Sequence, residues 1–426
     1  MFPSASPLRI AVLSLHGCPL DQLGTREVGG MQIYIRELSR ALGSRGVQVD
    51  VFTRRTRVNL DRVVTFGDGA RVIHLDAGPP RRIDKNSVIE HLPAFIENLD
   101  RFRDREAIHY DLVHSHYWLS AWVGDRLGDL WRVPRVITFH TLGRVKNRAN
   151  QGATAFVGPL ETERRNDIER RVARRADGVV VSTEHERALL IEQYGSRRER
   201  VVVIPPGADL ERFAPRDRRA ARVRLAIDES DGIVLFVGRI DPVKGLDVLF
   251  EAIAELRARP RLRLLVIGGS PAAADPVDED ERELRSLAES LGVAERVTWL
   301  GPIDQDRLPD YYSAADVCVV PSRYESFGLV ALEALASGAV VIASRVGGLS
   351  TTIHDGENGI LVPWRTGTAF ADAIARVLDD RDLAERLRTA APISVRKFSW
   401  RETAASIETL YRNLCVQTSV RACADG

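Results

Sequence analysis

The chain has 426 residues, with 60 lysines and arginines against 59 aspartates and glutamates and a formal net charge of +1. This length favours two domains over a single core, and the near-neutral charge gives no reason to expect a nucleic-acid partner. No apolar run reaches the roughly 20 residues that a membrane-spanning helix needs, and the four cysteines, which form no CxxC pair, are typical of reduced thiols in a cytoplasmic protein.

The first half of the chain alternates apolar β-rich runs with amphipathic helical segments. Residues 8–15 are typical of a strand buried on both faces, and residues 29–46 place isoleucines and leucines at helical spacing. A strand at 47–53 completes a βαβ unit, because parallel strands need such a crossover. The same pattern predicts strands at 72–78, 111–116, 135–141, 178–183 and 201–207, and helices at 86–103 and 119–129.

A second alternation follows the polar segment 217–224, and we therefore place the domain junction within 210–228. The expected strands are 232–240, 261–269, 297–301, 317–322, 339–344 and 359–363. The expected helices are 244–257, 279–291, 305–314, 327–337, 367–390 and 400–415, with a frayed end after them. The sequence thus predicts an α/β protein of two doubly wound domains, 1–215 and 216–426, with ligands at the carboxyl ends of the strands.

Two cations follow the first strand of the second half. Arg239 and Lys244 lie in the segment 238–245, which contains Gly238 and opens a helix. Arginine can bind a phosphate through two N–H groups, lysine acts as a point charge, and a helix N-terminus attracts anions. The pattern favours a phosphate or diphosphate ligand, although a solvated loop with two surface cations would show the same residues.

The segment 321–338 carries two glutamates eight positions apart, Glu325 and Glu333. Glu325 lies in the loop after a strand, and Gly328 begins the next helix, where unpaired N–H groups can face an anion. Glu333 lies within an otherwise apolar helix, where an isolated acid needs a partner. The two carboxylates suit the sugar and ribose hydroxyls of a nucleotide sugar. The alternative is one acid at a helix N-terminus and one surface acid.

The loop after the first strand of the first half is rich in glycine. Gly24, Gly29 and Gly30 leave backbone that a ligand can approach closely. A strict GxGxxG pattern is absent, which argues against a nicotinamide or flavin dehydrogenase.

Histidines lie at the ends of two neighbouring predicted strands. His116 and Tyr117 follow one strand, and His140 and Thr141 follow the next, while His114 is expected to face the core. No acidic or cysteine ligands accompany these histidines at metal-binding spacing, so we do not expect a metal site. Hydrogen bonds to a sugar or a phosphate fit these residues better.

With these residues identified, the chain resembles the family 4 glycosyltransferases of the GT-B fold over nearly its whole length. It is most similar to the sucrose-phosphate synthase-like branch, which includes the inositol-phosphate N-acetylglucosaminyltransferases of mycothiol synthesis. The motifs that carry this resemblance are 24–35, 111–120, 139–147, 205–213, 236–245 and 325–333.

The resemblance implies two facing Rossmann-like domains and transfer from a UDP-linked sugar with retention, without a metal or another cofactor. Arg239 and Lys244 would stabilise the leaving diphosphate, and Glu325 would bind sugar hydroxyls. His140 would lie near the reacting centre, and these four are the expected catalytic residues. The expected donor-binding residues are Gly30, Gly238, Arg239, Lys244, Glu325, Phe327, Gly328, Leu329 and Glu333.

The resemblance also implies a small, phosphorylated polyol or sugar as the acceptor. The expected acceptor-binding residues are Gly30, Lys85, Tyr117, Thr141 and Arg165. The segment 77–85 carries more arginine than this resemblance leads us to expect, which leaves a different anionic acceptor open. The helix at 400–415 is expected to pack back on the first domain.

Other functions on the same fold remain open at the sequence level. A UDP-sugar epimerase would need no acceptor, a lipid- or antibiotic-directed transferase would use a different one, and a non-catalytic protein would only bind the nucleotide sugar. The segment 164–175 contains six arginines in an amphipathic pattern, and such a pattern is also found in helices that bind a membrane surface. Its acidic residues and its lack of bulky aromatic side chains favour a solvated helix face instead.

Overall fold

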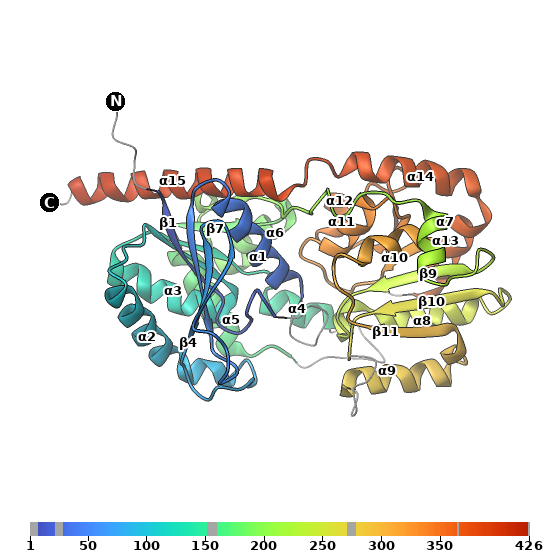
Figure 1. Ribbon diagram of the computed structural model, residues 1–426, viewed down its shortest axis with the longest axis horizontal. Helices are drawn as coiled ribbons and strands as arrows, with labels where there is room; N and C mark the ends of the chain where they lie inside the picture. The colour runs from blue at the N-terminus through green and yellow to red at the C-terminus, as the bar shows by residue number, and fades with distance from the viewer. Residues whose placement is uncertain (1–6, 22–28, 151–159, 271–277, 364–365, 425–426) are drawn as a thin grey trace.

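The computed structural model describes residues 7–21, 29–150, 160–270, 278–363 and 366–424 as two α/β domains that lie side by side (Figure 1). Each domain has a largely parallel sheet with helices on both faces. The predicted fold class is confirmed.

The first domain is built on an eight-stranded sheet in the order β3-β4-β2-β1-β5-β6-β7-β8. Its strands are β1 (Arg9–Leu13), β2 (Gln48–Arg54), β3 (Val63–Gly67), β4 (Ala70–Leu75), β5 (Leu112–His116), β6 (Arg135–Thr138), β7 (Gly178–Val181) and β8 (Val201–Val203). Strand β3 runs antiparallel to β4 at the edge of the sheet. The sequence analysis missed β3 because its side chains are only partly buried, and it lacks the apolar run that marks a buried parallel strand.

Helices cover both faces of this sheet. They are α1 (Gly30–Gly43), η1 (Ser87–His91), α2 (Leu92–Arg105), α3 (Tyr117–Trp131), α4 (Gly143–Asn150), α5 (Glu163–Arg175), α6 (Glu184–Leu189), η2 (Leu190–Tyr194) and η3 (Arg198–Arg200). Helices α2 and α3 share one apolar core with the sheet, and α1 shares the core on the opposite face. Helix α4 was not predicted because its sequence is short and mostly polar.

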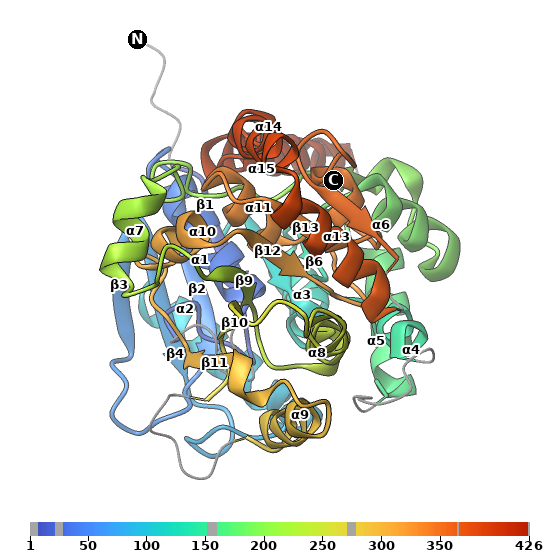
Figure 2. The same ribbon diagram turned by 90° about the vertical axis from the view of Figure 1, so that its right-hand side faces the viewer.

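The second domain has a six-stranded, all-parallel sheet in the order β11-β10-β9-β12-β13-β14. Its strands are β9 (Gly232–Val237), β10 (Leu262–Ile267), β11 (Val297–Gly301), β12 (Val317–Val320), β13 (Val341–Ser344) and β14 (Ile360–Val362). Its helices are α7 (Arg218–Arg224), η4 (Pro242–Lys244), α8 (Leu246–Glu255), α9 (Glu279–Ser290), η5 (Ala294–Arg296), α10 (Leu308–Ala314), α11 (Leu329–Ala336), α12 (Leu349–Thr352), α13 (Gly367–Asp379) and α14 (Arg381–Ser394). Helices α8, α9 and α13 cover one face, and α10 and α11 cover the other (Figure 2).

One helix boundary differs from the expectation, and the segment around the predicted domain junction forms a helix. The predicted helix 367–390 is two helices, because Asp380 ends α13 and its side chain accepts a hydrogen bond from the N–H of Leu383 in α14. The polar segment 217–224 forms α7, which packs on α10, and buried Arg222 lies 2.9 Å from Asp316. The segment is therefore part of the second domain, and the chain crosses between the domains before it.

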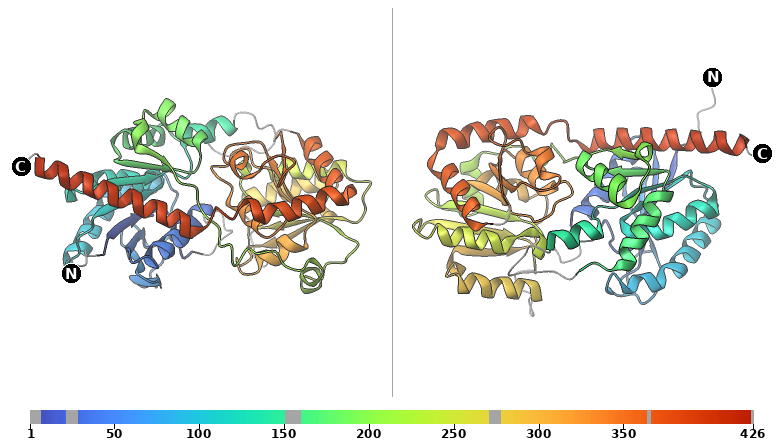
Figure 3. Two further views of the ribbon diagram at one scale, coloured as in Figure 1. Left: turned by 90° about the horizontal axis from the view of Figure 1, so that it is seen from above. Right: turned by 180° about the vertical axis from the view of Figure 1, so that it is seen from behind.

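Helix α15 (Trp400–Ala424) returns from the second domain and lies along the first (Figures 1 and 3). Ile407 and Tyr411 are buried against α1 and the sheet, and a 2.6 Å hydrogen bond joins the Tyr411 hydroxyl to Nδ1 of His114. The expectation of a frayed end is wrong, because the helix continues to Ala424. Within the described part of the chain, we find no helix whose length and apolar character would allow it to cross a membrane.

Candidate active site

The two domains meet where the carboxyl ends of their strands face each other. Ser326, in the loop after β12, donates a hydrogen bond to the main-chain oxygen of His140, which follows β6. The side chain of Leu329 packs against apolar residues of both domains. Ligands of open parallel sheets bind outside this end of the strands. The residues on either side of this contact therefore form the candidate site.

Gly29 and Gly30, at the start of α1, place bare backbone opposite the second domain. A Cβ atom at Gly29 would lie 3.1 Å from Cδ of Arg239, and one at Gly30 would lie 3.4 Å from Cδ1 of Leu329. The first turn of a helix has N–H groups without intrahelical partners. The glycines allow these groups to approach an anion held at Arg239. Residues 24–28 of the predicted motif, including Gly24, lie outside the described residues.

Arg239 and Lys244, which we call the donor-side cations because they are expected to bind the donor, lie in a tight turn after β9. Asp241 caps η4 by accepting a hydrogen bond from the N–H of Val243 at 3.0 Å. Gly245 adopts φ 70°, and a Cβ atom there would lie 2.1 Å from the main-chain oxygen of Pro321. This turn requires glycine, and it fixes the position of Lys244 at the end of the sheet.

Each of these cations is partly exposed and lies next to a carboxylate. Nζ of Lys244 is 2.6 Å from Oε2 of Glu325, and Arg239 is 3.3 Å from Asp241. Partly exposed ion pairs contribute little to stability, so a ligand anion can replace either carboxylate at low cost. The predicted group of Arg239, Lys244 and Glu325 is thus brought together by the fold.

Helix α11 begins at Leu329, two residues after the start of the predicted helix 327–337. Gly328 is the N-cap residue with φ 92°, and it supplies no side chain to the first-turn N–H groups. Phe327 packs into the core of the second domain, with its ring 5.6 Å from that of Phe398. The Phe327 side chain therefore faces the core, and the expected contact of this residue with the donor stays a prediction for its main chain alone.

Glu333 is buried within α11 and hydrogen-bonded on both oxygens. Tyr312 donates to Oε2 at 3.2 Å, and Gln305 donates to Oε1 at 3.4 Å. Burial raises the pKa of Glu333 from 4.5 to about 7. Gln305 also accepts a hydrogen bond from Arg36 of the first domain. The alternative interpretation of Glu333 as a surface acid is wrong.

Three histidines lie in a row toward the carboxyl ends of β5 and β6, with His114 and His116 buried and His140 partly buried. Nδ1 of His116 and Nε2 of His140 are 2.9 Å apart, and Nε2 of His114 is 3.0 Å from the Thr138 hydroxyl. Burial lowers the pKa of His114 and of His140 to about 3, so both are neutral at pH 7. His140 has φ 62°, which is rare outside glycine and is held here by its neighbours. Among the described residues, no group of three or more His, Cys, Asp or Glu side chains could hold a metal ion.

Four of the five predicted acceptor residues, all except Gly30, gather around the buried guanidinium of Arg165. Arg165 donates to the Tyr117 hydroxyl at 2.9 Å, to the Thr141 hydroxyl at 3.1 Å and to Oε1 of Glu169 at 2.6 Å. Lys85 lies 2.7 Å from Glu161, which is itself 3.0 Å from Arg165. We call Lys85, Lys146, Tyr117, Thr141, Glu161 and Arg165 the acceptor cluster. Helix α4, which carries Lys146, packs against η4, so this cluster adjoins the donor-side cations.

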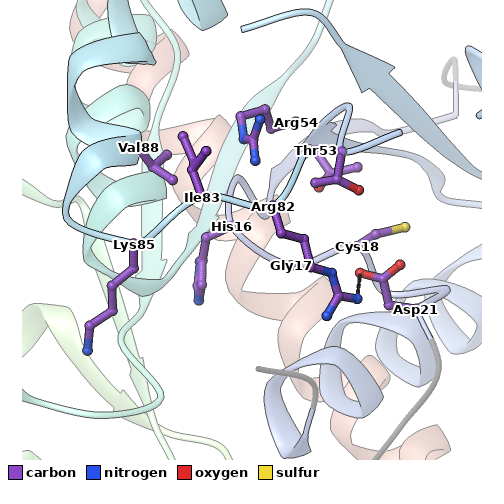
Figure 4. Close-up of a pocket in the computed structure, with 11 residues that line it drawn as sticks. His16, Gly17, Cys18, Asp21, Thr53, Arg54, Arg82, Ile83, Lys85 and Val88 are labelled. Carbon is purple, nitrogen blue, oxygen red and sulfur yellow. Dashed lines mark hydrogen bonds and ion pairs between the residues drawn. The ribbon is translucent and has the colours of Figure 1, made fainter. Parts of the chain in front are cut away.

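A pocket opens beside the acceptor cluster (Figure 4). Lys85 and His16 line it together with Arg54 and Arg82, and Arg82 reaches Asp21 at 3.5 Å. The His16 ring lies 4.4 Å from the ring of Tyr117. The arginine-rich segment noted in the sequence therefore forms one wall of a basic pocket next to the predicted acceptor residues.

Helix α5 does not present its arginines as one free basic face. Arg165 points into the protein, and Arg175 lies 2.7 Å from Asp125 and 2.6 Å from Asp129. Arg170 pairs with Asp167. Acidic partners thus neutralise part of the positive charge of α5, the helix for which binding to a membrane surface was considered.

Sequence comparisons agree with this geometry. The family described as "Glycosyl transferase 4-like domain" matches residues 29–207, and "Glycosyl transferases group 1" matches residues 217–393. The D-inositol 3-phosphate glycosyltransferase of Geodermatophilus obscurus is 44% identical over 415 residues, which cover 96% of this chain and 90% of the relative. The chain belongs to the group 1 glycosyltransferases. The glycosyltransferase of the same name from Corynebacterium glutamicum is 40% identical over 97% of this chain and 98% of its own.

Solved structures place this glycosyltransferase in the GT-B fold. The sucrose-phosphate synthase of Thermosynechococcus elongatus aligns with a TM-score of 0.89 and 38% identity, covering 96% of this chain and all of the other. Anabaena HepE in complex with UDP-glucose aligns with a TM-score of 0.74 at 20% identity, which shows the shared fold. The predicted family, fold and enzyme class are confirmed.

Proposed function

We propose that this glycosyltransferase moves a hexose or an N-acetylhexosamine from a UDP-linked sugar to a small phosphorylated polyol or sugar. Anomeric configuration is retained, and no metal ion takes part. The observation that carries the proposal is the acceptor cluster, in which Lys85, Tyr117, Thr141 and Arg165 converge beside the donor-side cations. Such a set of charged and neutral hydrogen-bond donors is suited to binding a phosphate ester. The relatives named for D-inositol 3-phosphate make inositol phosphate the first acceptor to test.

On the donor side, charge develops on the leaving diphosphate as the bond to the sugar breaks. Arg239, Lys244 and the first-turn N–H groups of α11 stabilise that charge in place of a divalent cation. The carboxylate of Glu325 releases Lys244 and accepts hydrogen bonds from the hydroxyls of the sugar instead. Glu333 binds the ribose. The acceptor oxygen bonds to the anomeric carbon on the face that the diphosphate leaves, and its proton passes to the departing phosphate. His140 holds the sugar at the reacting centre.

The test is a matrix of donors and acceptors with the purified protein. UDP-glucose and UDP-N-acetylglucosamine are each incubated with inositol phosphate, fructose 6-phosphate and unphosphorylated inositol, with and without EDTA. We expect a glycosylated phosphate ester by mass spectrometry, unchanged by EDTA, with the donor's anomeric configuration by NMR. Turnover of the donor without an acceptor to an epimeric UDP-sugar, or glycosylation of unphosphorylated inositol alone, would overturn the proposal.

A further inference from the structure

Glu161 lies at the centre of the cations that the proposed acceptor phosphate would need. Its Oε1 atom is 2.7 Å from Nζ of Lys85, 3.0 Å from Nη1 of Arg165 and 3.3 Å from Nζ of Lys146. These three residues come from three separate segments of the chain, and all three contact the same carboxylate oxygen. A carboxylate surrounded in this way has the contacts that an oxygen of a bound phosphate would make.

The backbone holds Glu161 at this point. Asn147 donates to the main-chain oxygen of Glu161 at 3.0 Å and accepts from its N–H at 2.7 Å. The Glu161 side chain is buried, at 3% exposure. Burial acts to raise its pKa, but Arg165 and Lys85 outweigh burial and lower the pKa to about 2. The carboxylate is therefore an anion at any pH at which the enzyme would work.

The charges of the cluster match a phosphate ester only when this carboxylate moves away. Lys85, Lys146 and Arg165 carry three positive charges, and Glu169, which stays bonded to Nε of Arg165, carries one negative charge. The balance without Glu161 is two positive charges, which is close in magnitude to the charge of about 1.5 to 2 that a phosphate monoester carries near pH 7. With Glu161 in place only one positive charge remains, and the carboxylate also occupies the hydrogen-bond donors.

We propose that Glu161 is a specificity-determining residue that acts as an internal competitor for the acceptor phosphate. In the free enzyme its carboxylate pairs with Lys85, Lys146 and Arg165, and a doubly charged phosphate displaces it. An acceptor with no charge or one charge gains too little from the cations to displace it. This inference rests on the proposed function in taking the acceptor as a phosphate ester, but its first test uses inorganic phosphate alone.

The decisive variant is Glu161→Gln, which keeps the size of the side chain and removes its charge. The matched control is Glu163→Gln, because Glu163 is an exposed acid two residues away whose carboxylate accepts from Asn166 rather than from these cations. Binding of inorganic phosphate is measured by the rise of Tm in phosphate-free buffer and by calorimetry. We expect Glu161→Gln to lower Tm without phosphate and to bind phosphate about tenfold more tightly, the scale set by removing one competing charge in a partly buried site. The control should match the wild type in both measurements.

Steady-state kinetics provide a second test of the inference once an acceptor is known. Glu161→Gln should lower KM for the phosphorylated acceptor with little change in kcat, and it should strengthen inhibition by inorganic phosphate. If Glu161→Gln does not fold, Glu161→Asp withdraws the carboxylate by one methylene and should shift phosphate binding in the same direction by a smaller factor. Phosphate binding that is unchanged or weaker in these variants would overturn the inference, because Glu161 would then only position the cations. Failure of every phosphorylated acceptor together with tighter phosphate binding would instead count against the proposed function alone.

Discussion

The acceptor side differs from the donor side in its central cation, because Arg165 is deeply buried while the outer lysines of the acceptor cluster, Lys85 and Lys146, are 30% and 20% exposed. The side chains of Lys244 and Arg239 are 21% and 30% exposed, and each faces a carboxylate across a partly open loop. Arg165 is 1% exposed, and its partner Glu169 is fully buried. Exposed pairs exchange partners easily, whereas breaking a buried pair leaves an uncompensated charge. The donor side is thus suited to a charge that appears during the reaction, and the buried Arg165 centre of the acceptor side to a charge that is present from the start.

The largest effect that this comparison predicts is on the donor side. Lys244→Ala should lower kcat about 100-fold or more, because one electrostatic partner of the developing negative charge is lost. Steady-state kinetics with a saturating donor measure this. Lys397→Ala, at an exposed position, is the control for loss of a lysine. Wild-type kcat in Lys244→Ala would mean that the leaving group does not depend on this ammonium group.

A substitution on the acceptor side should act on binding instead of turnover. Lys85→Met keeps the length of the side chain and removes a charged hydrogen-bond donor. We expect KM for the phosphorylated acceptor to rise about 10- to 100-fold, since hydrogen bonds to charged groups contribute about 1.5–3 kcal/mol. The donor KM and the rate of donor hydrolysis in water should stay near their wild-type values. A fall in kcat with an unchanged acceptor KM would place Lys85 outside the acceptor site.

Substitution of Glu333 tests whether, on the donor side, a residue that contacts the ribose acts differently from one that contacts the reacting sugar. Glu333→Ala should raise the donor KM about tenfold and leave kcat within about twofold, because a ribose contact is the same in the ground state and the transition state. Tyr312→Phe is a useful comparison, since it removes a hydrogen bond to Glu333 without removing the carboxylate. A loss of kcat as large as that of Lys244→Ala would instead show that Glu333 acts on the reacting bond.

The pH dependence of donor binding sharpens the assignment of Glu333. Burial raises its pKa to about 7, so the carboxylate of the free enzyme is protonated below that pH and ionised above it. If the ribose requires the ionised form, kcat/KM for the donor falls by about tenfold per unit as pH drops below 7 and is level above it. Glu333→Gln should abolish that step. The same step in the variant would assign the titration to another group.

The donor side could be predicted from the sequence because its residues occupy two short motifs after strands. Arg239 and Lys244 share one loop, and Glu325 lies three residues beyond the predicted end of a strand, so the topology alone brings them together. Phe327 belongs to the same motif but faces the core. A motif does not distinguish a residue that touches a ligand from one that supports the loop.

The acceptor side was only partly predictable, because its contacts join distant segments. Lys85 and Glu161 are 76 positions apart, and nothing in the local pattern marks Glu161 as the partner of a lysine. His16 and Lys146 were missed for the same reason, since each is an isolated polar residue in its own segment. The hydrogen bond between Arg36 and Gln305 crosses the domains and depends on how the two sheets face each other. Sequence spacing carries no signal for such pairs.

The smallest predicted effect concerns the helix that ties the two domains together. Tyr411→Phe keeps the aromatic ring of α15 in the first-domain core and removes the hydrogen bond to Nδ1 of His114, at a cost of about 1 kcal/mol in the free energy of unfolding. Urea unfolding with an unchanged m-value measures this cost. Because His114 lies beside His116, which contacts His140, the variant also tests whether the anchor of α15 affects the site. A stability loss with unchanged kcat and KM would limit the role of Tyr411 to holding α15. A matching loss of kcat would show that the row of histidines transmits the position of α15 to the reacting centre.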